Sequence, residues 1–148
     1  MAYGCVVVGS DGSATAERAV RTAAETAAAH GARLVIVTAY TPDADARAAA
    51  GDVPDDVRWA VTDVNQAEER VRHGRDIAAE AGVDGTITHA VAGRPEAVLL
   101  DVAGRFTADL IVVGSVGLTN KAHALLGSVA ASIAHHAPCD VLIVQTTA

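Results

Sequence analysis

Short runs of apolar, mostly β-branched residues alternate along this chain with longer alanine-rich segments, and this alternation restricts the fold more than any other feature. A continuous apolar run of four or five residues, bounded by turn residues, is typical of a strand that is buried on both faces. The longer segments repeat their apolar residues at helical spacing instead. Strands that alternate with helices form parallel sheets covered on both faces, so the pattern predicts an α/β protein. The predicted strands are residues 5–8, 34–37, 87–91, 110–113 and 141–144.

The predicted helices have recognisable ends. The first follows the turn at residues 9–12 and stops at Gly31, and Pro95 suits the first position of a helix over residues 95–106. Between the second and third strands a helical period includes Gly74, which costs about 1 kcal/mol relative to alanine. The apolar positions are Ala16, Ala19, Val20, Ala23 and Ala27 in the first helix, and Val57, Val61, Val64, Val71, Ile77 and Ala78 in the helix that contains Gly74.

Length, charge and composition limit the classes of function. The 148 residues are enough for one core, which predicts a single domain over residues 1–148. A net charge of −7 and an aromatic content of 3% oppose phosphate-backbone binding and base stacking, so nucleic acid is not an expected partner. The start lacks a basic leader and no apolar run could span a bilayer, so we expect a cytoplasmic protein without membrane contact. Cys5 and Cys139 are expected to be small buried apolar residues that form no disulfide.

Glycines cluster where the fourth predicted strand ends and where the last helix begins. Gly114 closes the strand, Gly117 follows three residues later, and the pair Gly127-Ser128 opens a helix predicted at residues 128–136. Because glycine lacks a Cβ, backbone N–H groups at such turns can approach a ligand, and a helix N-terminus adds unpaired donors with partial positive charge. This arrangement suits a phosphate. Each glycine alone is also explained by backbone geometry, and Ser128 can serve as a helix N-cap without a ligand.

The spacing Gly-x2-Gly-x9-Gly-Ser resembles the signature of the universal stress protein family, in the branch that binds ATP. The resemblance extends over essentially the whole chain, from Val-Gly-Ser-Asp-Gly-Ser at residues 8–13 through residues 91–95 to the apolar C-terminal strand. It implies one doubly wound, Rossmann-like sheet of five parallel strands in the order 3-2-1-4-5, with helices on both faces. In that order the turns after strands one and four face each other, and such sheets bind their ligands at this point.

The resemblance also implies a set of residues around an adenine nucleotide. Asp11 matches the family's acidic residue that contacts the nucleoside, through a ribose hydroxyl or the adenine amino group. An Asx turn or a helix cap is the alternative interpretation of the same residue. Gly9 and Ser10 would flank the base, Ala39 would lie beside the adenine, and two valines would complete the wall. The implied nucleotide-binding residues are Gly9, Ser10, Asp11, Ala39, Val113, Gly114, Gly117, Gly127, Ser128 and Val129.

The identity of the nucleotide depends on the charges near the glycines. Many ATP-binding members of the family carry Arg or His before the second glycine, whereas this chain has Val116 there and Leu118 after it. A triphosphate needs charged donors, whereas a cyclic monophosphate carries about one charge, which backbone N–H groups can satisfy. The candidate cations are Lys121, His123 and Arg94. Single-domain actinobacterial members that resemble this chain include some that bind cyclic AMP, so ATP and cyclic AMP are both candidate ligands, with Mg²⁺ as a candidate companion of ATP.

Motifs for catalysis are missing from the sequence. It has no Gly-x4-Gly-Lys-Ser/Thr loop, no nucleophile elbow, and no tetrahedral metal-ligand spacing around His135, His136 and Cys139. We therefore expect an adenine-nucleotide-binding regulator or nucleotide sink without efficient catalysis and without a metal site of its own. A slow ATP hydrolase and a ligand-free dimeric interaction module are the two alternatives.

The last predicted strand gives an expectation about assembly. It consists of Val141, Leu142, Ile143 and Val144, and has no charge of its own to protect an open edge. The family resemblance implies that this strand pairs antiparallel with its copy across a two-fold axis, which makes a homodimer.

Overall fold

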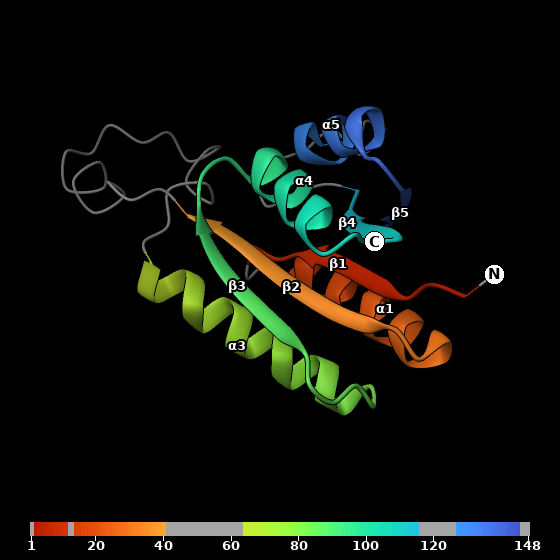
Figure 1. The fold of residues 1–148 in the computed structure, drawn as a ribbon. Helices are drawn as coiled ribbons and strands as arrows, with labels where there is room; N and C mark the ends of the chain where they lie inside the picture. The colour runs from red at the N-terminus through yellow and green to blue at the C-terminus, as the bar shows by residue number, and fades with distance from the viewer. Residues whose placement is uncertain (1, 12–13, 41–63, 116–126, 146–148) are drawn as a thin grey trace.

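Five parallel strands form one sheet in the order β3-β2-β1-β4-β5 in the computed structural model (Figure 1), which describes residues 2–11, 14–40, 64–115 and 127–145. The α/β class and the strand order 3-2-1-4-5 are thereby confirmed. Each observed strand includes the corresponding predicted run. The strands are β1 (Cys5–Gly9), β2 (Arg33–Tyr40), β3 (Ile87–Ala92), β4 (Leu110–Gly114) and β5 (Asp140–Val144).

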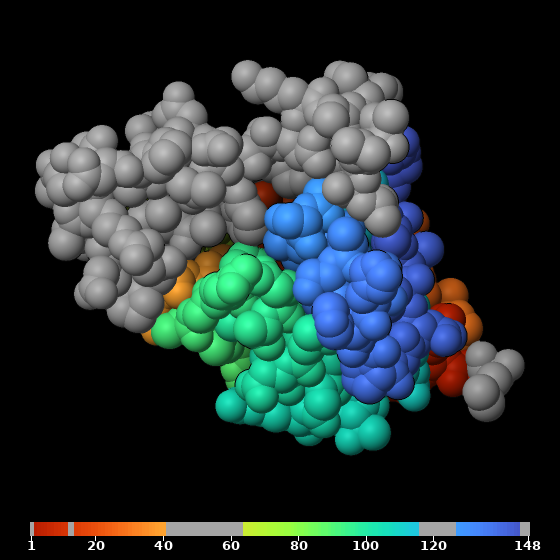
Figure 2. Space-filling model, turned by 90° about the horizontal axis from the view of Figure 1, so that it is seen from above, coloured from red at the N-terminus to blue at the C-terminus, as the bar shows by residue number. Residues whose placement is uncertain are grey.

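Helices cover both faces of the sheet. One pair, α1 (Ala14–His30) and α3 (Val64–Glu80), lies on one face, and the other pair, α4 (Pro95–Arg105) and α5 (Ser128–His136), lies on the opposite face (Figure 1). Figure 2 looks down on the face that carries α4 and α5. In the described ranges, no helix is both long enough and apolar enough to cross a membrane.

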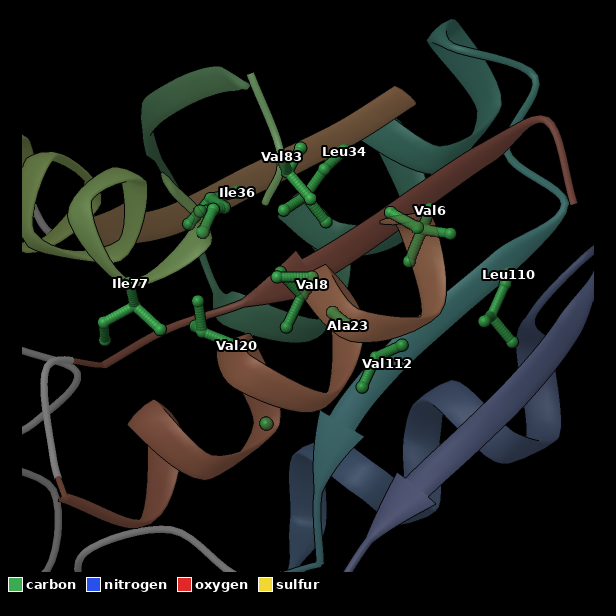
Figure 3. Close-up of a cluster of buried hydrophobic side chains, with 14 of the residues drawn as sticks. Val6, Val8, Val20, Ala23, Leu34, Ile36, Ile77, Val83, Leu110 and Val112 are labelled. Atoms are coloured by element: carbon green, nitrogen blue, oxygen red, sulfur yellow. The ribbon is translucent and has the colours of Figure 1, made fainter. Parts of the chain in front are cut away.

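The first core lies between the sheet and the helices α1 and α3 (Figure 3). The alternating residues Val6 and Val8 of β1 point into it and are fully buried. Short side chains on α1 let that helix approach the strands closely, and four of its five predicted face positions are fully buried. These four are Ala19, Val20, Ala23 and Ala27.

The prediction for α3 is confirmed over most of its length and is wrong at its start. Val71, Ile77 and Ala78 are buried as expected, but Val64 is 40% exposed. Val64 is the first residue of the helix, where the chain has only begun to lie over the sheet. The two other predicted face positions, Val57 and Val61, lie outside the described residues.

The second core lies between the sheet and the helices α4 and α5. The residues Cys5 and Val7 of β1 point into it, so β1 is buried on both faces. Cys5 is buried and Cys139 is half-buried, and both thiols are free. Burial raises the pKa of each thiol above its usual value, and the carboxylate of Asp140 adds to this effect on the pKa of Cys139. Both thiols are therefore poor nucleophiles at neutral pH.

Gly74 has a packing role within α3. A Cβ at this position would lie 3.2 Å from two side-chain carbons of Ile36 on β2 and 3.9 Å from Val20 on α1. The missing side chain therefore lets α3 approach the sheet and α1 at the same time. Its contribution to close packing explains why a residue with poor helix propensity is found there.

We expect Gly74→Leu to lower the free energy of unfolding by about 1–3 kcal/mol, because the added carbons overpack the contact with Ile36. The matched control is Gly104→Leu in α4, since no described atom beyond the adjoining backbone of its own helix lies within 4 Å of a Cβ placed there. That substitution should leave stability equal or raise it by up to about 1 kcal/mol through helix propensity. Urea unfolding of both variants measures the difference, and equal effects would contradict the packing role.

Candidate ligand-binding site

The carboxyl ends of β1 and β4 lie side by side at the point where the winding of the sheet reverses. After β1 the chain crosses to α1 on one face, whereas after β4 it crosses to α5 on the other face. Two neighbouring strands whose connections diverge in this way leave a crevice at the edge of the sheet between them. The starts of the two predicted turns, at the ends of β1 and β4, therefore lie at the same edge of the sheet.

The turn after β1 is held in place by β2. The N–H of Ser10 donates to the carbonyl of Val37 at 2.9 Å, and the buried hydroxyl of Thr38 donates to the carbonyl of Ser10 at 2.8 Å. These two hydrogen bonds hold the two successive peptide groups that flank Ser10, and so fix the direction in which the chain leaves the strand. Asp11 follows at once and is half-buried at the same edge.

Close packing explains why a glycine, Gly9, is found at the end of β1. A Cβ at this position would lie 3.0 Å from Cδ1 of Leu99 on α4. Its absence lets α4 pack closely over the strand end. This contact shows one structural role for Gly9, and it is compatible with the close approach of a ligand that the family resemblance implies.

The amino end of α5 presents backbone donors at this edge. The N-cap is Gly127, with φ −63° and ψ 160°, and its carbonyl accepts from the N–H of Ala131 at 3.0 Å. The interpretation of Ser128 as the N-cap is therefore wrong, because Ser128 is the exposed first residue of the helix. Within the described residues no side chain caps α5, and its first turn has no acidic residue, whereas α1 has Glu17 and α4 has Glu96 there.

The end of β4 and the start of α5 are joined through Ser115. The N–H of Ser115 donates to the carbonyl of Val144 at 2.8 Å, and its carbonyl accepts from the N–H of Gly127 at 2.8 Å. The hydroxyl of Ser115 donates to Oε1 of Gln145 at 2.8 Å. Sequence reasoning did not identify Ser115, Gln145 or Thr38. The available signals were a threonine directly after an apolar run and a serine between two glycines.

The described members of the predicted set lie along one edge, at the ends of three adjacent strands and the start of one helix. Ala39 is half-buried near the end of β2, and Gly114 is the last residue of β4. Val113 is only 4% exposed, and Val129 packs against the α4/α5 core. The remaining predicted site residue, Gly117, lies outside the described residues, as do Val116, Leu118, Lys121 and His123.

Arg94 lies at the carboxyl edge but away from the switch point. It is the N-cap of α4 after β3, and three strand spacings of roughly 5 Å separate β3 from β4. Its Nη2 pairs with Oε1 of Glu96 at 2.7 Å. At the other end of α5, Nδ1 of His136 contacts the carbonyl of Ser132 at 2.9 Å. Across the residues that the structure describes, no three potential metal ligands come together.

The strand order and the helices on both faces define a doubly wound α/β protein, a class in which ligands bind at the topological switch point. Comparison with known proteins narrows this class. Residues 2–145 match the model of the universal stress protein family. The chain is 43% identical over 147 residues to the universal stress protein Rv1636 of Mycobacterium tuberculosis, and the match covers 99% of each chain. The chain therefore belongs to the universal stress protein family.

Two solved structures of family members contain adenine nucleotides. A universal stress protein in complex with cAMP is 39% identical, has a TM-score of 0.75, and matches over 99% of this chain and 100% of that chain. A universal stress protein from Archaeoglobus fulgidus in complex with dAMP is 26% identical, has a TM-score of 0.69, and matches over 97% and 98% of the two chains.

We expect Thr38→Val to lower the free energy of unfolding by about 1 kcal/mol, because it removes the buried donor that holds the carbonyl of Ser10. The control is Thr88→Val on β3, whose Oγ1 accepts a hydrogen bond from Arg75 in an exposed setting. That variant should lose less than about 0.5 kcal/mol. The check is the urea unfolding midpoint of both proteins, and a Thr38→Val protein as stable as the wild type would show that the turn is held in another way.

Proposed function

We propose that this chain binds an adenine nucleotide, either ATP or cyclic AMP, at the carboxyl edge of β1 and β4, and serves as a nucleotide-dependent regulator or nucleotide sink without efficient catalysis. The single observation that carries the proposal is that β1, which leads to Asp11, lies next to β4, which leads to the start of α5 with Gly127 as its N-cap. The cAMP and dAMP complexes of related family members support it. The proposal keeps the single domain and the cytoplasmic location that the sequence predicts.

The backbone at the start of α5 supplies the proposed phosphate contacts. A helix leaves its first N–H groups without intrahelical partners, and its dipole places partial positive charge beside them. Gly127 offers no side-chain oxygen to accept from these groups, as a serine or an aspartate at the N-cap would. A phosphate oxygen would then take the place of the missing cap.

Asp11 is proposed to recognise the nucleoside. A carboxylate accepts hydrogen bonds and repels phosphate, so its suitable partners are ribose hydroxyls or the adenine amino group. Its position after β1, across the edge from the start of α5, separates the nucleoside end from the phosphate end. Gly9, Ser10 and Ala39 would then line the base.

The charges in the described part of the edge favour a ligand with a small negative charge. Arg94 pairs with Glu96 and lies beyond β2, so it is poorly placed to neutralise a triphosphate at β4. Backbone donors at one helix end are matched to roughly one charge, which is what cyclic AMP carries. If ATP binds, Mg²⁺ would be held mainly by its phosphate oxygens, because the described residues bring together no group of three metal ligands.

We expect Gly127→Asp to abolish nucleotide binding or weaken it at least tenfold, because its carboxylate would cap α5 and repel phosphate. The fold should survive, since φ −63° suits any residue and aspartate is a favoured N-cap. Gly127→Asn, which adds a cap of similar size without charge, should weaken binding less. Calorimetry with cyclic AMP and ATP measures both variants, and an unchanged affinity in folded Gly127→Asp protein would show that the site is misplaced.

Competition in the same calorimeter separates the two ligands. We expect cyclic AMP to displace ATP and to bind at least as tightly, and phosphate release from ATP to stay near the uncatalysed background. Tight ATP binding that cyclic AMP leaves unaffected would favour the ATP-specific alternative. Steady phosphate release would favour the slow hydrolase.

We also propose that the chain forms a homodimer through β5. Within the described residues β5 is an edge strand, and Leu142 on it is 37% exposed. A groove of about 320 Å³ runs beside it and is lined by Tyr3, Thr26, Leu110, Asp140, Val141 and Leu142. An apolar edge with a groove beside it is suited to strand pairing with a second copy.

The register of β5 shows which peptide groups such a copy would use. The carbonyl of Val144 accepts from Ser115 at the end of β4, and a residue's N–H and C=O point to the same side of a strand. The backbone of Val144 therefore points toward β4. The backbone groups of Val141 and Ile143 point toward the open edge.

We expect Ile143→Pro to shift the dimer toward monomer, because proline removes an outward N–H that the partner strand needs. The hydrogen bonds from β5 to β4 should survive, since they use the backbone groups of the alternate residues Leu142 and Val144. Light scattering at micromolar concentration measures the change, with circular dichroism to confirm folding. A monomeric wild-type protein under these conditions would rule out the dimer.

A further inference from the structure

Gln145, the residue that follows β5, is hydrogen-bonded to Ser115, which connects the end of β4 to the start of α5. We propose that Ser115 and Gln145 are positioning residues for the amino end of α5, so that nucleotide affinity depends on a side chain outside the proposed binding set. This inference rests on the proposed function. It adds that the nucleotide affinity of that site depends on Gln145, directly after the edge strand β5.

The backbone of Ser115 connects the two structural elements at the site. Its N–H extends the pairing of β4 with β5 by one residue, because it donates to Val144 at 2.8 Å. Its carbonyl accepts from the N–H of the N-cap residue Gly127 at 2.8 Å. Any rotation of the Ser115 peptide therefore moves the N-cap, and with it the direction of the first N–H groups of α5.

The side chain of Ser115 is fixed by Gln145. Ser115 is only 6% exposed, so its hydroxyl requires a hydrogen-bond partner, and Oε1 of Gln145 accepts from it at 2.8 Å. The backbone of Gln145 has a further contact, because its carbonyl accepts from Nη1 of Arg18 on α1 at 3.4 Å. Gln145 thus joins the end of β5 to both β4 and α1.

The affinity for nucleotide would depend on the orientation of the first N–H groups of α5. Preorganised donors bind an anion strongly only when they are held in the productive geometry, and the residues behind them supply that rigidity. A hydrogen bond that only stabilised the end of β5 would change global stability. A positioning bond also changes the local protection of Gly127 and the affinity for nucleotide.

The test measures amide exchange at Gly127 without ligand, and the affinity for cyclic AMP and ATP, in Ser115→Ala, Gln145→Leu and the double variant. We expect each single variant to speed exchange at Gly127 and to weaken binding by about three- to tenfold, the effect of one hydrogen bond. The double variant should lose little more than either single variant, because both remove the same link. Exchange in the central strands should stay unchanged.

Two further variants separate positioning from a general effect. Gln145→Glu keeps an acceptor for the hydroxyl of Ser115 and should restore slow exchange at Gly127. His136→Ala removes a side-chain contact at the far end of α5 and should change neither readout. Wild-type exchange at Gly127 in Gln145→Leu, or additive losses in the double variant, would overturn the proposal. If the wild type binds neither nucleotide, the proposed function is wrong, and exchange at Gly127 still decides whether the link positions the helix.

Discussion

The burial of β1 on both faces is the constraint on which the rest of the structure depends. Its residues alternate between the two cores, and Val6, Val7 and Val8 have no exposed surface. Helices must therefore cover both sides of the strand, and right-handed crossovers bring them there from opposite directions. The chain after the neighbouring strand β4 goes to the other face, which makes the carboxyl ends of β1 and β4 the topological switch point of the sheet. The candidate site is thus a consequence of how the central strand is covered.

Apolar periodicity was sufficient to predict the elements of this fold. Apolar runs located the five strands, and the helix predicted at residues 128–136 has the bounds observed for α5. The strand order was not accessible to periodicity, because parallel strands with helical connections can be arranged in several orders. The order came from the family resemblance. The predicted second strand stopped at Val37 because Thr38 interrupts the apolar run, whereas the observed β2 continues to Tyr40.

The contacts that shape the candidate site were beyond sequence reasoning because they join distant residues. Thr38 lies 28 residues from Ser10, and Ser115 lies 30 residues from Gln145. No local spacing encodes such a pair. The glycine pattern located the α5 terminus correctly, but it left an N-cap role for Ser128 open, because serine is a favoured cap and a pattern alone does not distinguish the cap from the first helical residue. The structure gives that position to Gly127, which has no side chain with which to cap the first donors.

The two proposals for β5 use different parts of the same strand. The odd-numbered residues Val141 and Ile143 direct their peptide groups to the open edge, while Val144 and Gln145 hold Ser115 and, through it, Gly127. A second copy paired along the outer edge would fix the strand that supports the start of α5. By linkage, a nucleotide that favours the ordered start of α5 would then favour pairing to the same degree. A short edge strand would in this way join assembly to ligand binding without a separate moving domain.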